Sequence, residues 1–101
     1  MSGYALVVHA DAVVDYDEAY CWYEDQQKGL GEQFLSAINS KTQQILDGSE
    51  IFDVKGREGC HEAIVNDFPY TIVYRIYKKK KIIFINSVHH QKKHPRKKYR
   101  Q

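Results

Sequence analysis

The stretch that decides the fold is FPYTIVYRIYKKKKIIFINSV, residues 68–88. Within it, Thr71–Tyr77 and Ile82–Val88 are rich in β-branched and aromatic residues, which are typical of strands. Lys78–Lys81 separates the two runs and predicts a tight hairpin turn. Because Ile82–Ile85 is apolar on both faces, we expect the second strand to lie in the interior of the sheet. The proline before the first strand marks a bend, since proline restricts its own backbone and that of its predecessor.

Two helices are predicted upstream of this hairpin, over about residues 11–27 and about 31–47, because apolar residues recur there at helical spacing. Asp11 is the expected N-cap of the first helix. Gly29 can adopt the left-handed conformation that ends it, and the short connection folds the second helix back antiparallel to the first. The residues predicted to face the core are Val13, Tyr16, Tyr20 and Tyr23 with Ala12 and Ala19 in the first helix, and Phe34, Leu35, Ile38, Thr42, Ile45 and Leu46 in the second.

Shorter β-forming segments complete the chain. Tyr4–Val8 is predicted to form a first strand, Ile51–Val54 a short edge segment, and Cys60–Asn66 a weakly alternating strand. The expected order is β-α-α-β-β-β, an α+β fold in which a helical hairpin packs on an antiparallel sheet. The length of 101 residues suits one domain over residues 1–101, with a basic tail at about 92–101 that either forms a helical turn or stays mobile.

Charge is distributed unevenly along the chain. Residues 1–77 hold all 13 acidic and five of the 15 basic residues, for a net charge of −8, whereas residues 78–101 carry the other ten basic residues, for +10. Such a split indicates an anionic partner for the basic end, or its pairing with an acidic surface. The longest apolar run is about five residues against the roughly 18 needed to cross a bilayer, and the N-terminus lacks the pattern of a secretory signal. We therefore expect no membrane partner.

Cysteine and histidine spacing does not favour a metal site. Cys21 and Cys60 have no zinc-type spacing and are interpreted as reduced, largely buried thiols. His89, His90 and His94 lie close together in sequence, but a strand directs the first two to opposite faces, and neither a carboxylate nor a thiol lies near them. We expect neither a metal nor a cofactor.

Several short signatures occur in one order along the chain: Trp22-Tyr23, Gly29-Leu-Gly31 with Phe34, Phe68-Pro-Tyr70 with Ile72-Val-Tyr74, and Val88-His-His90 leading through Lys92-Lys93 to Pro95. Together with the predicted element order, they resemble the ParE branch of the RelE/ParE superfamily, the toxins of type II toxin–antitoxin systems. The resemblance covers about residues 4–100. It is the joint order and spacing that carry it, because each motif by itself is common.

The resemblance implies a cytoplasmic toxin that inhibits growth and is neutralised by direct binding of a cognate antitoxin, in a toxin–antitoxin hetero-oligomer. Members inhibit DNA gyrase or cut mRNA on the ribosome, and the Gly-Leu-Gly, Phe and Trp-Tyr signatures resemble the gyrase-directed branch. The sequence departs from the family at Cys60-His61 and at Lys92-Lys93, where arginine is common. Lysine retains the charge but lacks the planar fork that binds phosphate or carboxylate at two points.

Under the gyrase hypothesis the chain is a non-enzymatic inhibitor, with Trp22, Tyr23 and Phe34 as scaffold. The residues expected to contact the target or the antitoxin are Lys92, Lys93, Arg96, Lys97 and Arg100. The alternative is a ribosome-dependent mRNA endoribonuclease, whose acid, base and cations would come from His90, Lys92, Lys93 and Tyr99. A third hypothesis is a non-toxic nucleic-acid-binding relative. In the toxin interpretation, the lysine hairpin and the segment after the last strand together form the working end.

Overall fold

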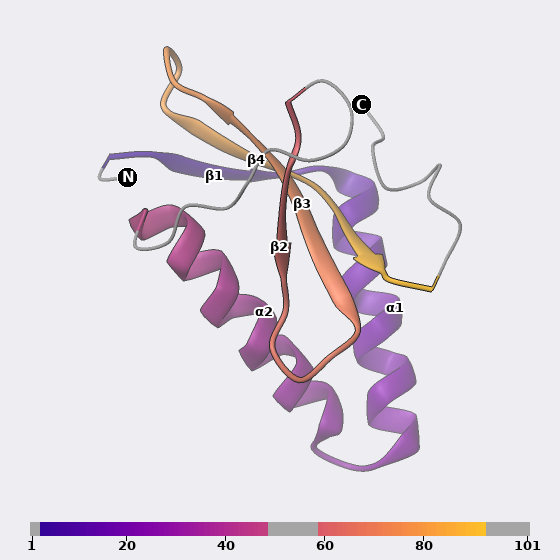
Figure 1. The fold of residues 1–101 in the computed structure, drawn as a ribbon. Helices are drawn as coiled ribbons and strands as arrows, with labels where there is room; N and C mark the ends of the chain where they lie inside the picture. Colours follow the sequence, from indigo (N-terminus) through magenta and orange to yellow (C-terminus); the bar gives the residue numbers. More distant parts are fainter. Residues whose placement is uncertain (1–2, 49–58, 93–101) are drawn as a thin grey trace.

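A computed structural model describes residues 3–48 and 59–92 of the chain. Its elements, in order, are β1 (Ala5–Val8), α1 (Ala10–Gln26), α2 (Leu30–Asp47), β2 (His61–Ile64), β3 (Tyr70–Tyr77) and β4 (Ile82–His90). Figure 1 shows the two helices as a hairpin, with the strands crossing over it. The predicted α+β class and the order β-α-α-β-β-β are confirmed. The expected edge segment Ile51–Val54 lies outside the described residues.

The four strands form one sheet in the order β1-β4-β3-β2, so β4 lies in its interior as predicted. β2, β3 and β4 are antiparallel neighbours, whereas β1 pairs parallel with β4. The expectation of an antiparallel sheet is therefore wrong for β1, and the sheet is mixed. A tight turn dictates the direction of β4 relative to β3. By contrast, both helices and the strands β2 and β3 lie between β1 and β4 in sequence, which permits parallel pairing.

The strand pairing is longer on β4 than the sequence pattern predicted. Tyr70 pairs with His90 and Thr71 with His89, so β4 continues two residues beyond Val88. A register shift at Val73/Tyr74 leaves Asn86 as an extra residue on β4. This bulge changes the alternation of side chains and allows both Ile85 and Val88 to face the core.

The first helix begins differently from the prediction. His9, not Asp11, is the N-cap of α1, and its Nδ1 accepts a hydrogen bond from the Asp11 backbone N–H at 3.0 Å. Asp11 lies instead in the first turn, where its negative charge interacts favourably with the helix dipole. Both the Asp11 carboxylate and the His9 imidazole offer a hydrogen-bond acceptor. Because α1 begins at Ala10, the residue in the N-cap position is His9.

The core lies between the helices and one face of the sheet. Its central side chains include Phe34, Ile38 and Ile45 of α2, which face Ile72 and Ile83 of the sheet. On α1 the buried stripe is narrower than predicted: Ala12, Ala19 and Tyr23 are buried, Tyr16 and Tyr20 are half-buried, and Val13 is exposed. Leu35, Thr42 and Leu46 are half-buried, and Lys41 is buried beside them.

Two further predictions about burial are wrong. Trp22, expected in the scaffold, exposes 59% of its surface, and only its neighbour Tyr23 packs into the core. Cys21 is exposed, whereas Cys60 is buried as expected. Residues 21–23 are consecutive on a helix, so their side chains point in three different directions. The face of α1 that packs on the core can bury only one of them.

The corner between the helices explains the Gly-Leu-Gly motif. Gly29 adopts the left-handed conformation with φ of 89°, which glycine tolerates without steric cost. A Cβ atom at Gly31 would lie 2.8 Å from the Tyr20 carbonyl oxygen. The close approach of the first turn of α2 to α1 therefore requires a residue without a side chain at this position. The Glu24 carboxylate accepts the backbone N–H groups of Gly29 at 3.0 Å and of Gly31 at 2.9 Å, which fixes the corner.

Candidate functional site at the end of strand β4

An aromatic cluster of four side chains joins three separate parts of the chain. Tyr23 of α1, Phe34 of α2, Phe68 of the β2–β3 connection and Tyr70 of β3 pack with ring centroids 5.0–6.3 Å apart, in edge-to-face or tilted arrangements. Such pairs stabilise a fold by about 0.5–1.5 kcal/mol each beyond the burial of their area. Three of the four sequence signatures therefore contribute side chains to this aromatic cluster.

The last residues of β4 are attached to this aromatic cluster. The ring of His90 packs edge-on against Tyr70, with centroids 5.0 Å apart. Its Nδ1 accepts the backbone N–H of Lys92 at 3.0 Å, and the backbone N–H of Gln91 donates to the Pro69 carbonyl at 3.0 Å. The chain leaving β4 is thus held against the Phe-Pro-Tyr bend, and Lys92 is exposed immediately beyond it.

A carboxylate of α1 ties the helix to the same end of β4. Asp15 Oδ2 accepts the backbone N–H of Val88 at 3.2 Å, across 73 positions of sequence. Burial raises the pKa of Tyr70, and nearby Tyr23, Asp15 and Glu18 raise it further. Burial also raises the pKa of Tyr23. Both phenols are therefore protonated at neutral pH, so they contribute aromatic surface here and do not act as bases.

The structure brings together only part of the predicted site. His90 and Lys92 are described and adjacent, as expected from their spacing. The remaining predicted contact and nuclease residues, Lys93, Arg96, Lys97, Tyr99 and Arg100, lie outside the described residues. The lysine hairpin Lys78–Lys81 lies at the other end of β4, a strand of nine residues. At about 3.3 Å per residue, β4 separates the hairpin from Lys92 by roughly 26 Å, so these described lysines lie at opposite ends of the strand.

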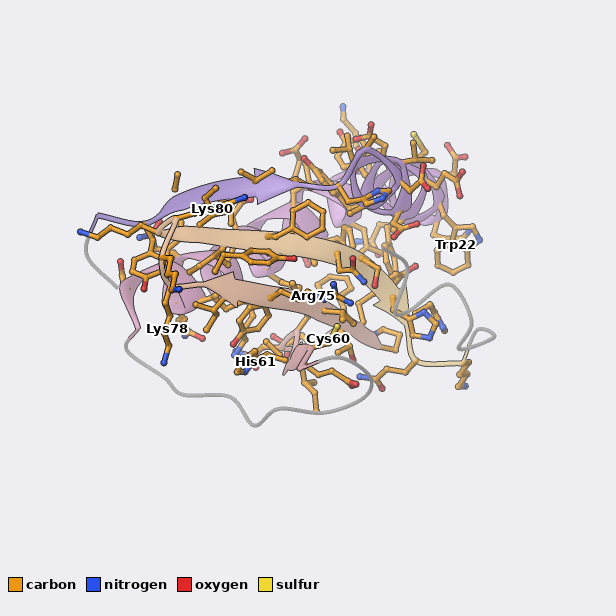
Figure 2. All side chains as sticks on the ribbon, turned by 90° about the horizontal axis from the view of Figure 1, so that it is seen from above. Trp22, Cys60, His61, Arg75, Lys78 and Lys80 are labelled. Atoms are coloured by element: carbon orange, nitrogen blue, oxygen red, sulfur yellow. The ribbon has the colours of Figure 1, made fainter. Side chains whose placement is uncertain are left out.

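One contact that the sequence did not predict joins Cys60, immediately before β2, to Arg75 of β3. Arg75 Nε donates a hydrogen bond to the buried Sγ of Cys60 at 3.2 Å, and Figure 2 shows the two side chains together. The neighbouring His61 stacks on Tyr74 with ring centroids 5.1 Å apart. Arg75 of β3 thus places a guanidinium group beside Cys60. The strand register, which pairs His61 with Tyr74, is the signal that locates it.

Metal and membrane chemistry have no structural counterpart in the ranges 3–48 and 59–92. In those ranges, no group of three or more His, Cys, Asp or Glu side chains is arranged to hold a metal ion. Nor does either helix of the described chain combine the length and the apolar character required to cross a bilayer.

A helical hairpin packed on a four-stranded mixed sheet is the arrangement of the RelE/ParE class of fold. The chain belongs to the family described as the ParE toxin of the type II toxin–antitoxin system parDE, whose model matches residues 6–95. It is accordingly a toxin of a type II toxin–antitoxin system. No curated protein sequence is similar enough to match the chain.

Two solved structures share the fold. One, described as the chromosomal ParDE toxin–antitoxin system from P. aeruginosa, has a TM-score of 0.74 at 14% identity, covering 86% of this chain and 95% of that one. The other is a mutant of E. coli toxin RelE in complex with a peptide of the antitoxin RelBc. Its TM-score is 0.61 at 20% identity, covering 84% of this chain and 80% of that one. At these identities the likeness concerns the fold.

Proposed function

We propose that this toxin inhibits growth by binding DNA gyrase, without cutting RNA, and that a cognate antitoxin neutralises it by direct binding in the cytoplasm. The observation that carries the non-enzymatic half of the proposal is the use of His90. Of the set His90, Lys92, Lys93 and Tyr99, the structure describes His90 and Lys92, and histidine is the residue type of the two that suits acid–base chemistry near neutral pH. The His90 ring packs on Tyr70, and its Nδ1 accepts the Lys92 backbone N–H.

An imidazole in this position is poorly suited to general acid–base catalysis. A catalytic histidine must exchange a proton with the substrate, and one that relays protons uses its second nitrogen for a partner that stabilises the charged form. Here the second nitrogen accepts a backbone N–H, an interaction that disfavours protonation of that nitrogen. This hydrogen bond supports a role for His90 in capping the end of β4 over a role in proton transfer.

The antitoxin half of the proposal is supported by the family and by the basic segment after β4. The RelE structure that shares the fold is bound to an antitoxin peptide. Lys92, Lys93, Arg96, Lys97 and Arg100 are proposed to contact gyrase or the antitoxin. Charge complementarity of this kind accelerates association more than it increases affinity. We propose that toxin and antitoxin form a hetero-oligomer.

The test is induction of the toxin in cells, followed by parallel labelling of DNA with thymidine and of protein with methionine. Thymidine incorporation should fall first, and ribosome-bound mRNA should remain uncut. Loss of protein synthesis first, with cuts in ribosome-bound mRNA, would establish the RelE-like endoribonuclease in place of a gyrase inhibitor. Normal growth on induction would establish the non-toxic relative.

Two variants of His90 separate its structural roles from catalysis. His90→Phe retains an aromatic ring against Tyr70, and His90→Asn retains a side-chain acceptor for the N–H two residues on. Both remove the imidazole. Toxicity should persist in both if the chain is a binding inhibitor, and it should disappear in both if the imidazole transfers protons during RNA cleavage.

A further inference from the structure

The candidate site at the far end of β4 assigns no role to the lysine hairpin, Lys78–Lys81. All four lysines are exposed and connect β3 to β4. Figure 2 shows Lys78 and Lys80 extending from one end of the sheet, with Trp22 at the opposite end of the molecule. The hairpin is therefore too far away to take part in the aromatic cluster or to contact His90.

Turn chemistry does not account for these residues. Hairpin turns favour Gly, Asn, Asp, Pro and Ser, and this turn contains none of them. The Lys81 N–H donates to the Lys78 carbonyl at 3.3 Å, and Lys81 adopts a left-handed conformation with φ of 53°. Side chains other than Gly, Asn and Asp rarely adopt that conformation, because it brings Cβ close to the following carbonyl oxygen. Local backbone preference therefore does not account for lysine at position 81.

The surroundings of the hairpin add to its positive potential. β1, β3 and β4 meet at this end of the sheet, where the Ala5 N–H donates to the Lys81 carbonyl, and these three strands contain no acidic residue. Arg75 and Tyr77 alternate with the residues that face the core, so they share the other face of β3. Tyr77 exposes 42% of its surface directly beside Lys78.

We propose that Lys78–Lys81, with Tyr77 beside it, binds the phosphate backbone of a nucleic acid without regard to sequence. A row of flexible ammonium groups suits the regularly repeated charges of a phosphodiester chain. An exposed aromatic ring beside such a row is the arrangement with which proteins stack unpaired bases. The exposed Tyr77 ring favours a nucleic acid over an acidic protein surface, because unpaired bases stack on aromatic side chains. This proposal does not depend on whether gyrase is the target.

The test measures binding of the full-length toxin to labelled 20-nucleotide probes of duplex DNA, single-stranded DNA and single-stranded RNA by fluorescence anisotropy, at 50 and 200 mM salt. The variant is Lys78→Gln with Lys79→Gln and Lys80→Gln, which leaves the left-handed Lys81 unchanged. If each lysine neutralises one phosphate, the salt slope on duplex DNA falls by about 0.9 for each. Affinity should then decrease about 40-fold less between the two salt concentrations than it does for the wild type.

The matched single variants are Lys79→Gln and Lys28→Gln, which remove the same charge from exposed lysines at the hairpin and at the helical corner. The first should lower the salt slope by about one and the second should leave it unchanged. The probe bound most tightly identifies the nucleic acid. Equal slopes for the triple variant and the wild type would overturn the proposal. So would binding of the hairpin to vesicles of anionic lipid with none to the probes.

The test separates this proposal from the proposed function. A triple variant that loses nucleic-acid affinity yet still arrests thymidine incorporation supports the hairpin as a site of its own. A variant that binds the probes like the wild type refutes the hairpin site whatever its effect on growth. Circular dichroism of the triple variant checks that its fold is retained.

Discussion

Gly31→Ala tests the account of the helical corner. In an ordinary helix this substitution stabilises the fold by about 1 kcal/mol, because alanine is the better helix former. Here the new methyl group would lie 2.8 Å from the Tyr20 carbonyl oxygen and 2.9 Å from both Tyr20 Cδ2 and Glu24 Oε1. The first of these is a backbone atom of α1, so the contact cannot be relieved by turning a side chain.

The expected cost follows from the two effects that oppose the helix preference. Overpacking of a tight contact costs about 1–3 kcal/mol. Displacing Glu24 also weakens its bonds to the N–H groups of Gly29 and Gly31, and hydrogen bonds to charged groups contribute about 1.5–3 kcal/mol. These outweigh the gain in propensity, so we expect a net loss of roughly 1–3 kcal/mol in the free energy of unfolding.

The assay is urea unfolding of the purified toxin followed by circular dichroism. Gly31→Ala should lower the midpoint with an unchanged dependence on urea, which reports lost stability and not a changed unfolded state. Ser36→Ala, on the exposed face of α2, is the control and should be as stable as the wild type or slightly more so. A Gly31→Ala midpoint equal to or above the wild type would refute the close approach of α1 and α2.

Two further predictions concern α1 and β3. Asp15→Ala leaves the Val88 N–H without the carboxylate and should lower the free energy of unfolding by about 1–3 kcal/mol. Asp15→Asn retains an acceptor and should lose less stability. Equal stability of the two variants and the wild type in urea would contradict the hydrogen bond. Burial raises the pKa of Tyr74 from 10.0 to about 12, so the folded state favours the neutral phenol, and the resulting stability is complete below pH 10 and is lost as the pH rises towards 12. Thermal unfolding between pH 9 and 12 should show this loss, and Tyr74→Phe should reduce it; an identical pH dependence in the variant would refute the assignment.

The elements of the fold could be predicted because their signals are local. Ile82–Ile85 is apolar on both faces, and that alone indicates an interior strand. The parallel pairing of β1 could not be predicted, because no turn joins β1 to β4 and neither strand carries a mark of direction. The sequence likewise could not show that His9 is the N-cap of α1, because His9 and Asp11 both offer an acceptor within one turn.

The candidate site could be predicted only where it is contiguous in sequence. His90 and Lys92 are two residues apart, and their proximity required no knowledge of the fold. The bond from Arg75 to Cys60 depends on the register of β2 against β3, and the one from Val88 to Asp15 depends on how α1 packs on β4. Composition suggested one basic working end, whereas β4 separates the lysine hairpin from Lys92.

The central claim is that this member of the ParE toxin family inhibits gyrase by binding and not by RNA cleavage. The most direct test is gyrase-catalysed supercoiling of relaxed plasmid in the presence of purified toxin, with the His90→Phe and His90→Asn variants alongside. Inhibition that rises with toxin concentration and persists in both variants is the predicted result. Normal supercoiling at saturating toxin would contradict the claim.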